Sequence, residues 1–241
     1  GNTALVGASN KTVGSNAQQG ADYVFVNPPA SPTITKSFGA ASIPLNGTTS
    51  LTFTIGNHTT DPMTGIAFTD NLPSGLLIST PNGLTGDCGG GIITAVEGTG
   101  VISLSGATLA GGVSCTFSVN VTSIATGTQN NVTGNITFDG GTGGTASASI
   151  NVIQCTYTIS PASKTLTYKG GSVTINVKAN DHISCPAPAI VNNNPDWIAE
   201  TASAFTKNKG TVKLTIPGLD SSIQRVGTLT IGGNTFTVTQ K

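Results

Sequence analysis

The sequence predicts an all-β protein made of two tandem Ig-like β-sandwiches, preceded by an N-terminal extension that forms strands. Apolar residues recur with period two through most of the chain, which is typical of strands with one buried face. Turn-forming clusters such as STPNGLTGDCGGG and FDGGTGGT separate these stretches. Only 8% of the residues are charged and 32 are Gly, a composition that suits sheets with Thr and Ser on their exposed faces and is unusual for a cytoplasmic enzyme.

The extension covers residues 1–30 and ends in a Pro-rich hinge. Its two predicted strands hold Leu5 and Val6 in the first and the apolar run Tyr23, Val24, Phe25 and Val26 in the second. Two strands alone are marginal in water, so this segment needs a partner. It either completes an edge of its own sandwich, or docks on another copy by β-strand addition, or is an excision boundary that orders only in a crystal. Because no starting Met or signal peptide is present, we expect a processed product or an excised fragment.

The first predicted sandwich covers residues 31–153. The stretch SLTFTIGN places Leu51, Phe53 and Ile55 on one face with Thr residues between them. The same alternation occurs in VISLSGATL, CTFSVNVTS, NVTGNITF and TASASINVI. We therefore expect a strand in each of these segments.

The second predicted sandwich covers residues 154–241. Its strands are expected in CTYTISP, KTLTYKG, GSVTINVKAN, GTVKLTIPG, RVGTLTI and NTFTVTQ, with a long irregular stretch from Asp181 to Ala202. The pair Gly232-Gly233 predicts a hairpin between the last two strands. The only candidate helix is the short segment NPDWIAETASAF.

The four cysteines allow three pairings. Cys88 and Cys115 fall in the first predicted sandwich, and Cys155 and Cys185 fall in the second. None has the CxxC spacing of a zinc or redox site. We predict one disulfide in each sandwich and a secreted, extracellular or cell-surface location, with four free buried thiols as the alternative.

The zero net charge of the chain conceals an asymmetry. Residues 1–154 have two lysines and six acidic residues, whereas residues 155–241 have eight basic and four acidic ones, so the two parts carry net charges of −4 and +4. Such a chain favours head-to-tail contact between copies, unless the asymmetry is chance drift between two domains. The sequence has no basic cluster of the kind that binds nucleic acid and no apolar run long enough to span a membrane. Its two histidines are isolated, so no metal site is expected. No cofactor is expected.

Three parts of the chain resemble known bacterial modules. Residues 155–241 resemble the BACON-type module in CTYTISPASKTL, GGSVTINVKA, DWI and RVGTLTIGGNTFTVTQ, a likeness that implies an Ig-like sandwich and suggests binding to surface glycans. Residues 31–153 look like an Ig-like repeat domain of long bacterial adhesins in PTITKSFGAASIPLNGTTSLTFTIGN, FTDNLPSGL, GLTGDCGGG and ISLSGATLAGGVSCTFSVNV. Residues 1–26 resemble one FG-GAP repeat of a β-propeller in GNTALVGA, TVGSNAQQG and ADYVFV, but a propeller needs several blades.

Lys36, Asp70 and Asn131 form a candidate crosslinking set. Some Ig-like surface domains join a Lys of the first strand to an Asn of the last, with an acid that polarises the amide. Here Lys36 lies early in the first strand of its sandwich, Asp70 lies in FTDNLP, and Asn131 precedes a late strand. The chemistry requires a desolvated, neutral amine. The more ordinary interpretation, which we favour from sequence alone, is an exposed Lys36 and an Asp70 that caps a turn.

Trp197 is the only Trp, so it is either a core residue or a sugar-stacking platform. The sequence has neither a GxSxG motif nor a recognisable pair of catalytic carboxylates, so we do not expect an enzyme. The preferred functional hypothesis is a structural subunit of an extracellular bacterial filament, assembled head to tail with copies of itself through the N-terminal strand. The alternative is a non-polymeric adhesin stalk or a carbohydrate-binding module.

Overall fold

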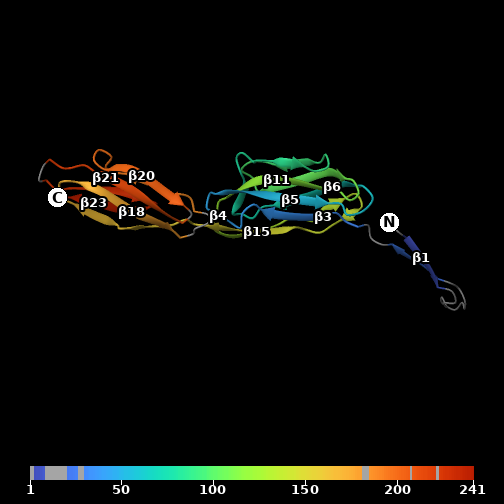
Figure 1. Ribbon diagram of the computed structural model, residues 1–241. Coiled ribbons are helices and arrows are strands. Elements are labelled where there is room, and N and C mark those ends of the chain that lie inside the picture. Colours follow the sequence, from blue (N-terminus) through green and yellow to red (C-terminus); the bar gives the residue numbers. More distant parts are fainter. Residues whose placement is uncertain (1–2, 9–20, 27–29, 181–184, 207, 221–222) are drawn as a thin grey trace.

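The computed structural model describes residues 3–8, 21–26, 30–180, 185–206, 208–220 and 223–241. Within these residues the regular structure is all β, with 23 strands in six sheets. Figure 1 shows two β-sandwiches lying end to end, with a separate two-stranded ribbon at the N-terminal end. Across the described ranges, no helix is long and apolar enough to cross a membrane. The predicted all-β sandwich fold is confirmed.

The N-terminal ribbon consists of β1 (Thr3–Ala8) and β2 (Ala21–Val26), which pair antiparallel with Thr3 opposite Val26. These strands contain the predicted anchor positions Leu5, Val6 and Tyr23 to Val26. Among the described strands, β1 and β2 pair with each other and with no strand of either sandwich. The ribbon therefore does not complete an edge of its own sandwich in this structure.

The first sandwich runs from β3 to β15 and consists of three sheets. One sheet has the order β14-β13-β6-β10-β9, a second has β3-β5-β11-β7 with β8 also on β11, and a third has β12-β15-β4. The strands are β3 (Thr33–Phe38), β4 (Ser42–Pro44), β5 (Thr48–Gly56), β6 (Met63–Asn71), β7 (Leu76–Ile78), β8 (Thr85–Asp87), β9 (Ile92–Ala95), β10 (Val101–Leu109), β11 (Ser114–Ser123), β12 (Gly127–Val132), β13 (Thr137–Phe138), β14 (Gly141–Thr142) and β15 (Ser147–Ile153).

Alternating apolar residues form the core of this sandwich. Leu51, Phe53 and Ile55 on β5 are fully buried, as the alternation predicts. The Phe53 ring lies 5.1 Å from the ring of Phe117 and 5.3 Å from that of Phe68, so aromatic contacts join β5, β11 and β6. We expected a single strand in the segment NVTGNITF, but the structure does not form one there. The segment contributes the end of β12 and then, after a break, β13.

The second sandwich packs two four-stranded sheets, with the orders β16-β18-β21-β20 and β17-β23-β22-β19. Its strands are β16 (Tyr157–Ser160), β17 (Ser163–Leu166), β18 (Gly171–Ala179), β19 (Ile190–Asn192), β20 (Ala199–Thr206), β21 (Lys209–Ile216), β22 (Arg225–Ile231) and β23 (Asn234–Gln240). The predicted hairpin is confirmed, since Gly232 and Gly233 both have positive φ between β22 and β23.

The stretch predicted to be irregular or weakly helical contains two strands. In its described part, β19 pairs with β22, and β20 pairs with β21 from Ala199 to Thr206. The prediction of an irregular stretch from Asp181 to Ala202 was therefore wrong for Ile190–Asn192 and for residues 199–202. Pairing with β21 outweighs the low strand propensity of the Ala- and Ser-rich segment AETASAFT.

Both predicted disulfides are present. Cys88 is bonded to Cys115 on β11 in the first sandwich. In the second, Cys155, just before β16, is bonded to Cys185, which lies between β18 and β19. No described cysteine is free. Two disulfides fit an oxidising, extracellular environment.

Candidate functional site: a buried Lys–Asp–Asn cluster

Three polar side chains occupy inward positions in the first sandwich where apolar residues would be expected. In β3 the buried positions alternate from Ile34 to Lys36, and in β6 they run from Phe68 to Asp70. In β12 the corresponding inward position is Asn131. Successive side chains of a strand point to opposite faces, so the same alternation that buries the apolar residues also buries these three.

The strand pairing brings the three residues together. Asp70 bridges to Thr133, just beyond the end of β12 and two residues from Asn131. Lys36 lies opposite Phe53 in the β3–β5 pair, and its Nζ is 5.9 Å from the centre of the Phe53 ring. The cluster thus joins β3, β6 and β12, which belong to three different sheets.

Asp70 contacts both of the other side chains. Lys36 Nζ donates a hydrogen bond of 2.9 Å to Asp70 Oδ1, and Asn131 Nδ2 donates one of 2.8 Å to Asp70 Oδ2. The side chains of Lys36 and Asp70 have no exposed surface, and Asn131 is 1% exposed. The carboxyl group therefore lies between an amine and an amide, shielded from solvent.

Burial favours the neutral form of the Lys36 amine. Desolvation lowers the pKa of Lys36 below its ordinary value, and this effect outweighs the hydrogen bond and the charge of Asp70, which act to raise it. A neutral amine has a free lone pair and is a nucleophile, which a protonated ammonium is not. The site thus favours the reactive form of the lysine.

Asn131 retains one unsatisfied polar atom. Its Oδ1 is the only buried side-chain N or O atom without a hydrogen-bond partner in the described part of the chain. Such an atom costs about 1–3 kcal/mol, so it calls for an explanation. A carboxyl group that carries a proton can donate to an amide oxygen, and the Asp70 carboxyl is the polar group next to this amide.

This geometry corrects the interpretation that we favoured from sequence. Lys36 is not exposed, and Asp70 is a buried residue of β6 rather than the cap of an exposed turn. Asn131 lies within β12 instead of preceding a strand, and the last strand of the sandwich is β15. The signal that sequence reasoning missed is the period-two register, which places all three polar residues on inward-facing positions.

Trp197 lies partly buried against the core of the second sandwich. The guanidinium carbon of Arg225 is 4.2 Å from its ring centre, and a Cβ on Gly227 would come within 2.5 Å of the ring. Close neighbours on β22 therefore pack against this ring, which leaves less of it for a sugar than a free aromatic platform offers. No group of three or more potential metal ligands occurs among the described residues.

The profile of one protein family, a domain of unknown function named DUF7933, matches residues 32–152. This is half of the chain and includes Lys36, Asp70 and Asn131. The chain belongs to the DUF7933 family. The DUF7933 region coincides with the first sandwich, β3 to β15, so the buried cluster lies inside the family domain.

Several solved structures resemble this DUF7933 protein, with low sequence identity and low TM-scores. A non-cellulosomal cohesin from Archaeoglobus fulgidus is 17% identical with a TM-score of 0.37, covering 50% of this chain and 91% of its own. The bacterial hydrophobin BslA is 21% identical with a TM-score of 0.37, over 53% and 98%. A type II cohesin dyad from Acetivibrio cellulolyticus is 11% identical with a TM-score of 0.37, over 82% and 87%. No curated protein matches the sequence.

Proposed function

We propose that this protein is a structural module of an extracellular bacterial filament or surface appendage, whose DUF7933 sandwich is locked by a covalent bond between Lys36 and Asn131. The observation that carries the proposal is the buried cluster, in which Asp70 contacts both the amine and the amide. A salt bridge buried in this way is weak support for stability alone, because desolvation opposes the attraction between its charges. A chemical role accounts for its presence in the core.

The bond forms by attack of the neutral Lys36 amine on the side-chain carbonyl carbon of Asn131. A proton first passes from Lys36 Nζ to Asp70, along the 2.9 Å hydrogen bond. The protonated carboxyl then donates to the amide oxygen, which requires the amide to turn and gives Oδ1 its missing partner. The Nζ–Cγ bond forms, the Cγ–Nδ2 bond breaks, and Nδ2 leaves as ammonia with the proton that the amine gives up. No oxidant, metal or external reactant is needed.

Intact-mass spectrometry of the purified protein tests the bond. The mass should be lower than the sequence mass with two disulfides by one ammonia molecule, and a digest should contain the peptides of Lys36 and Asn131 joined. Lys36→Met, Asp70→Ala and Asn131→Ala should each restore the full mass. Asn130→Ala is the matched control, because the neighbouring Asn130 is exposed and the bond should still form. A wild-type mass without this loss would refute the bond.

The N-terminal ribbon is proposed as the joint between copies. Its two strands pair with no described strand of the sandwiches, and the apolar run Tyr23–Val26 needs burial that a two-stranded ribbon does not supply. Net charges of −4 for residues 1–154 and +4 for residues 155–241 favour head-to-tail order. An open contact of this kind gives a filament rather than a closed ring.

Electron microscopy distinguishes this assembly from the alternative, a non-polymeric adhesin stalk. The full chain should form filaments, and a variant that lacks residues 1–28 should give separate particles. Separate particles from both would favour the stalk. The BACON-like character of residues 155–241, and glycan binding through Trp197, would then be tested next with a glycan array.

A further inference from the structure

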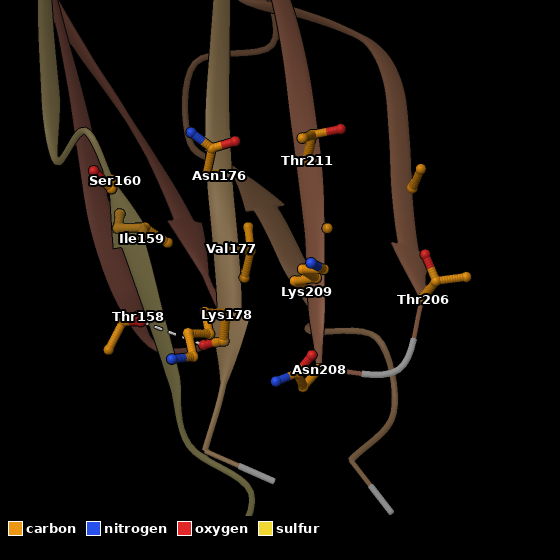
Figure 2. Close-up of a pocket in the computed structure, with 12 residues that line it drawn as sticks. Thr158, Ile159, Ser160, Asn176, Val177, Lys178, Thr206, Asn208, Lys209 and Thr211 are labelled. Carbon is orange, nitrogen blue, oxygen red and sulfur yellow. Dashed lines mark hydrogen bonds between the residues drawn. The ribbon is translucent and has the colours of Figure 1, made fainter. Parts of the chain in front are cut away.

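The strand β20 is the longest described strand that has a neighbour on only one side. It has eight residues and pairs with β21, and it forms the border of the sheet β16-β18-β21-β20. Figure 2 shows Thr206 on this border strand, with Thr211 and Asn176 on the strands further in. One row of backbone N–H and C=O groups of β20 is thus left for another strand.

The border formed by β20 lacks the usual protection against strand pairing. Its sequence, AETASAFT, has no Lys and no Pro, and its single charge, Glu200, lies at the irregularity between Glu200 and Ala202. All of its side chains except Phe205 are exposed, and most are small. Small, uncharged side chains allow another backbone to approach closely.

Space for incoming side chains lies on both faces beside β20. On the outer face is a hollow of about 800 Å³, lined in part by Ala204 and Thr206 of β20 and by Lys178 and Lys209 (Figure 2). On the inner face, a smaller cavity of about 140 Å³ lies beside Phe205, with Pro188 and other mainly apolar residues around it. The side chains of an added strand alternate between two such faces.

Two features indicate which segment binds to β20: the charges around the outer hollow, and the N-terminal ribbon, whose strands pair with no described strand of either sandwich. None of the described residues that line the outer hollow is acidic, while Lys178 and Lys209 are basic. The segment Ala21–Val26 carries one charged residue, Asp22, and four apolar residues in succession. With Asp22 toward the lysines of the hollow, the alternation places Tyr23 and Phe25 on the opposite face, toward the mainly apolar inner cavity.

We propose that β20 of one copy accepts the segment Ala21–Val26 of a second copy by β-strand addition. This inference rests on the proposed assembly through the N-terminal ribbon and names its receiving surface. In this assembly β2 separates from β1 of its own chain and forms backbone hydrogen bonds with β20 of the other copy instead.

Photo-crosslinking between full-length chains tests the receiving surface. A photoreactive amino acid replaces Val24, and this chain is mixed with an isotopically labelled unmodified chain, so that mass spectrometry separates crosslinks between chains from those within one. Crosslinks from residue 24 to residues 199–206 of the other chain are expected. Interchain crosslinks to another surface would overturn the β20 site while leaving the assembly intact. Absence of both interchain crosslinks and filaments would refute both.

Charge placed on β20 provides a second test. Ala202→Lys and Ala204→Lys together should lower the yield of the interchain crosslink by about tenfold or more, because lysines block strand borders. Thr174→Lys on β18 is the matched control, since Thr174 is also exposed but lies on an inner strand. Circular dichroism verifies that all variants fold. An unchanged yield in the β20 double variant would overturn the proposal.

Discussion

Two buried side-chain amides, one in each sandwich, differ in their hydrogen-bond partners. In the second, the amide of Gln240 is fully buried, and its Nε2 donates to the carbonyl oxygens of Thr167, Tyr168 and Pro217, while its Oε1 accepts from Arg225 Nε. In the first, Asn131 keeps an acceptor without a partner beside a desolvated amine. A polar group with all its hydrogen bonds satisfied holds a fold together, whereas an incomplete set beside a nucleophile is suited to chemistry.

The surfaces of the two sandwiches differ as well. Lys36 is the only Lys or Arg between residues 30 and 153, and it is buried, so the DUF7933 sandwich exposes acids without exposed Lys or Arg. The second sandwich exposes lysines on both sheets. Because Trp197 is the only Trp, its fluorescence reports on the second sandwich alone, which allows each sandwich to be followed separately.

The largest effect is expected from Asp70→Ala. This change leaves the Lys36 amine without its partner in the core, which should destabilise the DUF7933 sandwich by about 3–5 kcal/mol. Urea unfolding followed by far-UV circular dichroism should show an earlier transition, while the Trp197 transition stays in place. Asp87→Ala is the control, because Asp87 is exposed and its loss should change little. An unshifted transition in Asp70→Ala would contradict the role of the cluster.

Reduction of the disulfides should sharpen the contrast. Each disulfide is worth about 3–4 kcal/mol on the chain-entropy model for a loop of this length. The second sandwich loses its only covalent link between strands, whereas the first keeps the proposed bond from Lys36 to Asn131. The Trp197 transition should therefore shift to lower urea by more than the dichroism transition of the DUF7933 sandwich. In Asn131→Ala the two shifts should become similar; a difference that persists there would count against the bond.

A change confined to the second sandwich should have an intermediate effect. A Cβ on Gly227 would lie 2.5 Å from Trp197 and 2.8 Å from Ile198, so Gly227→Ala should cost about 1–3 kcal/mol through overpacking. The shift should appear in Trp197 fluorescence and not in the first sandwich. Gly218→Ala, whose Cβ would make only ordinary contacts at 3.5 Å or more, should leave both transitions unchanged.

The smallest effect concerns pH. The variant Asn131→Ala cannot form the proposed bond, so its Lys36 keeps a free amine whose pKa burial lowers. At pH values between that lowered pKa and the ordinary value, the folded state therefore binds fewer protons than the unfolded state. Stability should therefore rise with pH through this window, by at most about 1.4 kcal/mol per pH unit. Urea midpoints at several pH values measure the slope. Adding Lys36→Met should remove it, and a slope that survives would assign it to another group.

The sequence predicts the fold well because strand alternation and turn clusters are local signals. Leu51, Phe53 and Ile55 are buried as expected, and both disulfides join the expected cysteines. The segment AETASAFT was missed because Ala, Ser and Glu have low strand propensity, and its pairing with β21 is a tertiary effect.

The candidate site was predicted only in part. The three residue types were identified, but FTDNLP looks like a turn, and the burial of Asp70 becomes evident only when the alternation from Ile66 and Phe68 is extended by one step. The proximity of Asn131 depends on the bridge between Asp70 and Thr133, which no local pattern specifies. Contacts between different sheets are the part that sequence periodicity does not contain.

The position of Lys36 near the start of the first sandwich has a consequence for how the chain extends under tension. A pull on the two ends of a bonded chain passes from β3 to β12 through the crosslink, so the residues between them are bypassed. At about 3.3–3.6 Å per residue, a segment of roughly 90 residues represents about 300 Å of length that the protein does not release. The bypassed segment encloses the disulfide between Cys88 and Cys115, which would therefore carry no load and remain shielded from force-assisted reduction.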